Sequence, residues 1–246
     1  IVMKKFILSF SFILALASFS LQPVLALDPI VVGLNKFKKE DRVVKNFNGV
    51  AAGGPIQVII TLGNTESMRF EGDADAIATL ITEVKGNILV IRPQNSWTSW
   101  ARKYENKKIT AYVTAKTIKS LTMSGNGGMT VNGKINETNL TTTLSGSGNI
   151  TANANVSNFT GVISGSGKLN ISGSSDNTTI TVSGSGSFGK GFSTDNLSTV
   201  ISGSGNITVN ATNSISAVIS GSGNINYSGN PSIEKRISGS GRIRKI

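Results

Sequence analysis

Ser145-Gly146-Ser147-Gly148 is the first of six copies of one tetrapeptide. The later copies begin at Ser164, Ser183, Ser202, Ser220 and Ser238, at steps of 19, 19, 19, 18 and 18 residues. A looser copy, Ser124-Gly125-Asn126-Gly127, precedes the first copy by 21 residues. A fixed period of about 20 residues indicates structural repeats that stack and share one core.

Three columns of mostly apolar residues keep a fixed distance from each tetrapeptide, and their neighbours are polar. This alternation with a period of two is typical of half-buried strands. Five residues before the first serine stand Leu140, Phe159, Thr178, Leu197, Ile215 and Ile233. One residue before it stand Leu144, Ile163, Val182, Ile201, Ile219 and Ile237. Five residues after it stand Ile150, Leu169, Phe188, Ile207, Ile225 and Ile243.

The composition of each repeat excludes stacked helices, because glycine pairs recur and Thr, Val and Ile dominate. The glycines of the tetrapeptide supply the positive φ angles that a tight corner needs. A second corner is predicted six residues before each copy, where asparagine or serine can stack between rungs: Asn139, Asn158, Asn177, Asn196, Ser214 and Ser232. The chain is therefore predicted to be all-β, a parallel β-helix (β-solenoid) with rungs of 18–19 residues.

Residues 1–26 have the pattern of a signal peptide. Lys4 and Lys5 precede an apolar run that is too short for a transmembrane anchor, and Val24-Leu25-Ala26 offers a cleavage site. We expect a mature chain that is exported, has no transmembrane segment, and resides in the periplasm or at the cell surface. The sequence contains no cysteine, so packing alone must hold the fold together.

The rest of the chain divides into three parts. Residues 27–46 are expected to be a basic, poorly structured lead-in to a single domain over residues 47–246. Within that domain, residues 47–122 are predicted to form irregular first rungs and a cap, and residues 123–246 the regular rungs. The cap is expected to contain a short helix near residues 73–81 with Asp73 as its N-cap, and a polar loop over residues 95–108.

The net charge of +11 lies outside the body of the repeats, mainly in residues 36–45, residues 102–119 and the final rung. Loss of Lys4 and Lys5 with the signal peptide lowers it to about +9. Between residues 141 and 230 the only charged residues are Lys168, Asp176, Lys190 and Asp195. This distribution is not the continuous basic stripe of a nucleic-acid-binding protein, so nucleic acid is not an expected partner.

Catalysis is not expected either, because the chain has no histidine and no cysteine. The alternative is a carbohydrate-active β-helix enzyme, whose candidate residues would be Asp176, Asp195 and Lys168. Asp176 and Asp195 each lie seven residues before a tetrapeptide, so they should stack on adjacent rungs and could hold Ca²⁺ with backbone carbonyls. We favour ordinary turn chemistry for this pair, since each aspartate is followed by asparagine, and no cofactor is required.

Two files of small side chains are predicted on the outer surface, four and two residues before each tetrapeptide. They could form a flat face that lies against a polysaccharide, a partner sheet or ice. The alternative is that β-branched residues simply suit outward strand positions. The candidate face comprises Thr141, Thr143, Thr160, Thr179, Thr181, Ser198 and Ser216, with Val162, Val200 and Val218 between them.

Trp97 and Trp100 lie in the predicted polar loop beside Arg102, Lys103 and Tyr104. They could stack on sugars or dip into a membrane interface. We favour a second role, in which they fold back to cover an end of the solenoid.

Several segments resemble the head GIN-domain family of auto-transporter adhesins, common in exported proteins of Bacteroidetes-type bacteria. The resemblance rests on residues 46–50 (Asn-Phe-Asn-Gly-Val), 54–58 (Gly-Pro-Ile-Gln-Val), 71–75 (Glu-Gly-Asp-Ala-Asp) and the repeated Gly-Asn-Ile at 148–150, 205–207 and 223–225. It covers roughly residues 42–246 and implies a single right-handed β-helix. With the residue patterns, it leads us to expect a non-enzymatic adhesin or glycan-contacting module of the cell envelope. Its expected partner is a polysaccharide or an envelope protein.

Overall fold

The computed structural model describes residues 37–246 except residues 105 and 190, and the described residues belong to one compact unit. The predicted signal peptide and residues 27–36 lie outside the described residues. Neither helix of the described residues is long and apolar enough to cross a membrane.

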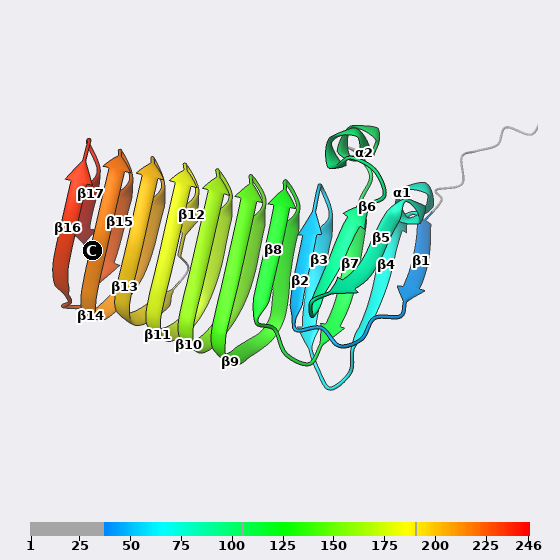
Figure 1. The fold of residues 1–246 in the computed structure, drawn as a ribbon, viewed down its shortest axis with the longest axis horizontal. Helices are drawn as coiled ribbons and strands as arrows, with labels where there is room; N and C mark the ends of the chain where they lie inside the picture. Colours follow the sequence, from blue (N-terminus) through cyan, green and yellow to red (C-terminus); the bar gives the residue numbers. More distant parts are fainter. Residues whose placement is uncertain (1–36, 105, 190) are drawn as a thin grey trace, which may run out of the picture. The chain divides into compact units, whose positions relative to one another are not determined.

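The predicted β-solenoid is confirmed (Figure 1). Strands make up 71% of the chain and helices 5%, and the strands wind through about seven turns with rungs of about 19 residues. Each long strand bends, so its two halves pair with neighbours in two different sheets. The first half of β9 pairs with β3, whereas its second half pairs with β8. The strands concerned are β3 (Gln57–Leu62), β8 (Ser120–Gly125) and β9 (Gly128–Gly146).

The stack therefore has two main faces. We call the strands that lead into the tetrapeptide corner the motif sheet and the strands that leave it the second sheet. The motif sheet contains β8, the second halves of β9, β10 (Asn149–Gly165), β11 (Lys168–Gly184), β13 (Phe192–Gly203) and β14 (Asn206–Gly221), and then β16 (Ser232–Ser238). The second sheet contains β3, the first halves of β9, β10, β11 and β14, and β12 (Ser187–Phe188), β15 (Asn224–Ser228) and β17 (Arg242–Lys245).

The predicted apolar columns form the core. Ile150, Leu169, Ile207 and Ile225 are fully buried, as are Leu144 and Ile163 in the column before the tetrapeptide. Thr178 interrupts an apolar column, and its side chain is only 2% exposed. The core tolerates this hydroxyl because it forms a hydrogen bond with the hydroxyl of buried Ser175. In the last rung Ile233 and Ile237 remain 39% exposed, since no further described rung covers them.

The second corner carries the predicted ladder of stacked asparagines. The side-chain amide of Asn158 donates to Asn139 at 3.0 Å, that of Asn177 to Asn158 at 3.2 Å, and that of Asn196 to Asn177 at 3.2 Å. Ser214 then donates to the Asn196 oxygen at 2.9 Å. Each bond joins neighbouring rungs, so the ladder helps to fix their register.

The first rungs are irregular, and antiparallel strands flank them. β2 and β3 lie parallel to β6 and β7, while β4 pairs antiparallel with β7, and β5 with β6. The remaining elements are β2 (Gly49–Gly53), β4 (Ser67–Asp73), α1 (Ala74–Ala78), β5 (Leu80–Lys85), β6 (Ile88–Pro93), α2 (Trp97–Lys103) and β7 (Ile109–Ala115).

Two expectations for this region are wrong in part. Residues 37–42 of the lead-in are strand β1 (Phe37–Arg42), which pairs antiparallel with β4; an exposed ion pair of 2.7 Å between Arg69 and Asp41 joins the two strands. The predicted loop over residues 95–108 contains helix α2. The predicted helix near Asp73 is confirmed as α1, but it ends before Leu80 because β5 begins there.

Candidate functional site

The predicted outer files come together on the motif sheet. Parallel pairing aligns Thr141 with Thr160, Thr160 with Thr179, and then Ser198 and Ser216 in turn. The second file runs through Thr143, Val162, Thr181, Val200 and Val218 in the same way. We call this surface the hydroxyl–methyl face; Figure 1 shows its strands side by side along the stack.

The face extends one strand further than the sequence reasoning proposed. Ser120 and Thr122 of β8 are in register with Thr141 and Thr143, so they continue both files. The looser tetrapeptide at Ser124 was the signal, since these residues stand four and two positions before it.

The hydroxyl–methyl face is chemically uniform. From β8 to β14 its two files carry only Ser, Thr and Val, with no charged side chain. Val200 is 41% and Val218 42% exposed, so methyl groups as well as hydroxyls reach solvent. Rungs lie about 4.8 Å apart, so the short side chains of the face form a regular array of hydroxyl and methyl groups. Such an array suits a neutral ligand with both apolar and hydroxyl surface.

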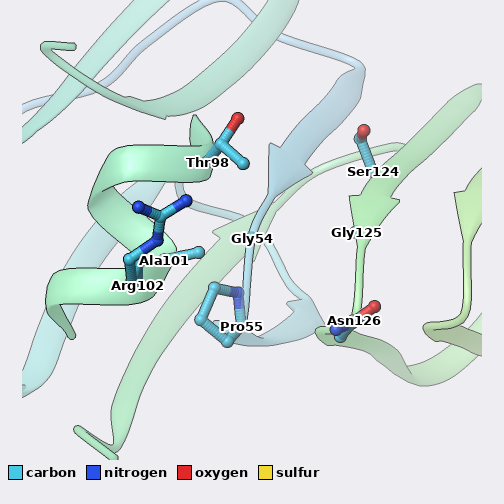
Figure 2. A pocket seen from close by; sticks show the side chains of 8 residues that line it. All are labelled: Gly54, Pro55, Thr98, Ala101, Arg102, Ser124, Gly125 and Asn126. Carbon is cyan, nitrogen blue, oxygen red and sulfur yellow. The ribbon is translucent and has the colours of Figure 1, made fainter. Parts of the chain in front are cut away.

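A pocket of about 480 Å³ lies beside one edge of this face (Figure 2). Thr98, Ala101 and Arg102 of α2 form one wall, and Ser124, Gly125 and Asn126 at the end of β8 form the other. Gly54 and Pro55 lie between the two walls. The pocket thus combines apolar carbon from Pro55 and Ala101 with the polar groups of Arg102 and Asn126.

Two polar side chains of this pocket have no hydrogen-bond partner among the described residues. Neither the Arg102 guanidinium nor the Asn126 amide bonds to any residue that the structure describes. The sequence reasoning missed the pocket because one wall is α2, which was expected to be loop. A pocket of this volume is within the range of small-molecule sites, about 300–1,000 Å³.

Trp100 holds α2 against the body of the domain. Its side chain is 5% exposed, its Nε1 donates to the Thr79 hydroxyl at 2.7 Å, and its ring lies 5.2 Å from that of Tyr104. This burial favours the covering role over contact with a ligand. The side chain of Trp97 is outside the part of the chain that the structure describes.

Asp176 and Asp195 occupy neighbouring rungs at the second corner, between the aligned pairs Ser175–Thr194 and Asn177–Asn196. Both are exposed, and the Thr212 hydroxyl donates to Asp195 at 2.7 Å. No group of three or more metal-ligating His, Cys, Asp or Glu side chains occurs in the described residues. Calcium at this pair stays a prediction, since Ca²⁺ takes 6–8 oxygen ligands and two carboxylates supply only part of that number.

The runner-up enzyme hypothesis needs Lys168 close to these carboxylates. Lys168 begins β11 on the second sheet, whereas Asp176 lies beyond the bend of the same strand. No ion pair joins Lys168 to Asp176 or Asp195 among the described residues.

Comparison with known proteins agrees with this architecture. A search of curated proteins finds no match. A putative adhesin from Bacteroides fragilis has 23% identity and a TM-score of 0.73, over 86% of this chain and 97% of that one. A putative lipid binding protein from Parabacteroides distasonis has 22% identity and a TM-score of 0.70, over 87% and 98%. A putative adhesin from Parabacteroides merdae has 18% identity and a TM-score of 0.67, with the same coverage.

At these identities the solved structures establish the fold alone. The family comparison is more specific, because the model described as "Putative auto-transporter adhesin, head GIN domain" matches residues 46–231. The resemblance drawn from the sequence segments is thereby confirmed, and the chain belongs to the auto-transporter adhesin head GIN-domain family.

Proposed function

We propose that this chain is an exported, non-catalytic binding module of the cell envelope that contacts polysaccharide through the hydroxyl–methyl face. The observation that carries the proposal is the register of that face, in which Thr141, Thr160, Thr179, Ser198 and Ser216 align on successive strands. Membership of an adhesin family supports a binding role.

The chemistry of the face suits a sugar chain. Pyranose rings present C–H groups on one side and hydroxyls around the rim, so methyl groups and hydroxyls are both complementary to them. Each contact is weak, but a polymer meets many rungs at once, and linked contacts raise the overall affinity well above that of one. Ser124 borders both the face and the pocket of Figure 2, so a chain on the face can extend to Arg102.

The proposal is tested by applying purified residues 27–246 to an array of glycans and cell-wall polysaccharides, with and without calcium. We expect specific binding that Thr160→Tyr weakens at least about tenfold, because the ring covers the neighbouring rungs. Thr151→Tyr is the matched control, since Thr151 belongs to the same strand, β10, and pairs within the second sheet. A blank array, or equal losses in both variants, would contradict the proposal.

The same regular array also favours a second candidate, binding to ice. Thermal hysteresis of the purified protein tests it directly. Hysteresis that persists in the Thr160→Tyr, Thr179→Tyr double variant would remove ice binding by this face.

A further inference from the structure

A second polar surface lies on the other side of the molecule, where the last rungs of the second sheet form a hollow of about 260 Å³. Five side chains line it, and pairing aligns them in two short files. Asn206, Asn224 and Arg242 form the first file on β14, β15 and β17, while Asn226 and Arg244 form the second.

Hydrogen bonds within the hollow occupy two of its acceptors. The Asn224 Nδ2 donates to Asn206 Oδ1 at 3.1 Å, and the Arg244 Nη2 donates to Asn226 Oδ1 at 3.2 Å. The amide nitrogens of Asn206 and Asn226 and the whole Arg242 guanidinium bond to no described residue. The hollow is therefore rich in unused donors, and the Asn224 Oδ1 is its one unused side-chain acceptor.

The charge around the hollow is positive. Its lining contains two arginines and no carboxylate. The carboxylate of Glu234 lies in the motif sheet, on β16, where it is 4.0 Å from Arg236. A ligand in the hollow thus meets two guanidinium groups that no described carboxylate neutralises.

We propose that this hollow binds the carboxylate of a uronic-acid-containing polysaccharide. The Arg242 guanidinium presents a planar fork of donors, which matches a carboxylate in two parallel hydrogen bonds. The amide nitrogens of Asn206 and Asn226 donate to ring and hydroxyl oxygens, and Asn224 Oδ1 accepts from a sugar hydroxyl. A sulfate ion carries no hydrogen to donate and would leave that acceptor without a donor. The inference rests on the proposed function, in that it names an acidic class of the polysaccharides the module binds.

The test is titration calorimetry of residues 27–246 with polygalacturonate, dextran sulfate and neutral dextran at about 0.15 M salt, where weak surface attraction is screened. We expect polygalacturonate to bind more tightly than dextran sulfate. Arg242→Gln should weaken the binding of polygalacturonate about tenfold or more, since it removes a charge-assisted pair. Arg236→Gln is the matched control, because it removes the same charge from the same rung on the opposite sheet, and we expect it to have little effect.

Three results would overturn the inference: no binding of polygalacturonate, equal losses in the Arg242 and Arg236 variants, or tighter binding of dextran sulfate. Its failure can be told apart from failure of the proposed function. Neutral glycans that bind the wild type and are lost on Thr160→Tyr would leave the hydroxyl–methyl face intact as a site while the hollow is discarded. Polygalacturonate binding that persists in Thr160→Tyr, together with no binding of any neutral glycan, would keep the hollow as a site and discard the hydroxyl–methyl face.

Discussion

At the tetrapeptide corner, the backbone of one rung lies directly against the backbone of the next. Gly165 has a φ of +118°, and a Cβ added to it would lie 2.5 Å from the carbonyl oxygen of Gly146. Real Cβ atoms essentially never come so close, and the obstacle is backbone rather than a flexible side chain. Glycine at this position is therefore required by both the conformation and the stacking distance.

We expect Gly165→Ala to lower the free energy of unfolding by about 3 kcal/mol, because strain in φ adds to the clash between rungs. Chemical denaturation followed by circular dichroism measures the change. Gly86→Ala is the control: Gly86 also has a positive φ, +55°, but its Cβ would meet nothing within 4 Å. That variant should lose only about 1 kcal/mol. Equal losses in the two variants would show that close stacking of rungs has no separate cost.

Single residues were predictable from the sequence wherever the repeat fixes their surroundings. The burial of Ile150 and the ladder through Asn158 follow from position within the period alone. Arg42 could not be predicted in this way. It donates to the carbonyl oxygens of Leu80 at 2.6 Å and Ile77 at 3.0 Å, and its guanidinium lies 4.7 Å from the centre of the Phe70 ring. All three partners are distant in sequence and outside the repeats.

Among the elements, helix α1 depends on one carboxylate that serves two partners. Asp73 accepts from the Ala76 amide at 3.0 Å as the N-cap, and its other oxygen lies 2.9 Å from the Lys107 ammonium. The hydrogen bond from Lys107 is the main reason that the pKa of Asp73 lies below its ordinary value of 3.8, and the Ala76 amide contributes in the same direction. Burial opposes both effects.

Asp73→Asn is expected to make the free energy of unfolding less dependent on pH in the acidic range. Because the pKa is lower in the folded state, the carboxylate stabilises the fold above the ordinary value of 3.8, and this contribution is lost as the pH falls through the folded pKa. Asparagine keeps the cap but not the ion pair. The variant should thus be less stable than the wild type at pH 7, and the two should converge at pH values below 3.8.

Denaturation midpoints measured from neutral pH down to strong acid check this expectation. Lys107→Gln is the mirror control, since it removes the same ion pair and leaves the cap. A gap between wild type and Asp73→Asn that stays constant at all pH values would argue against any role for the charge.

The elements that the sequence did not predict share a physical cause. Strand β1 has the sequence Phe-Lys-Lys-Glu-Asp-Arg, which has no apolar alternation. It forms because its backbone pairs antiparallel with β4. Helix α2 is only seven residues long, too short to be stable through local propensity, and buried Trp100 anchors it. Both are formed by tertiary contacts, whereas the rungs carry their pattern within every period.

Taken as a whole, the molecule is a one-dimensional stack in which each rung contacts only its neighbours. Stability should then be close to a sum of rung and interface contributions, and an internal rung should be dispensable if the register survives. Residues 164–182 are such a rung, because their removal joins Ile163 to Ser183 and keeps every apolar column aligned. The deletion removes both partners of the buried hydrogen bond between Ser175 and Thr178, so neither hydroxyl is left unpaired. Buried Thr194 keeps its hydrogen bond to the Asn196 carbonyl at 3.1 Å.

We expect the chain without residues 164–182 to remain a folded β protein, with a melting temperature lower by about 5 °C or less, since one interface of several is lost. Far-ultraviolet circular dichroism and gel filtration give the readout. Deletion of residues 164–172 is the control: it removes fewer residues but leaves a rung of half length, so Leu169 is lost and the strands that follow cannot pair with β10. That shorter deletion should unfold or aggregate the protein. If instead the full-rung deletion is the more damaging of the two, stability is not shared between neighbouring rungs, and the stack must depend on contacts that span its length.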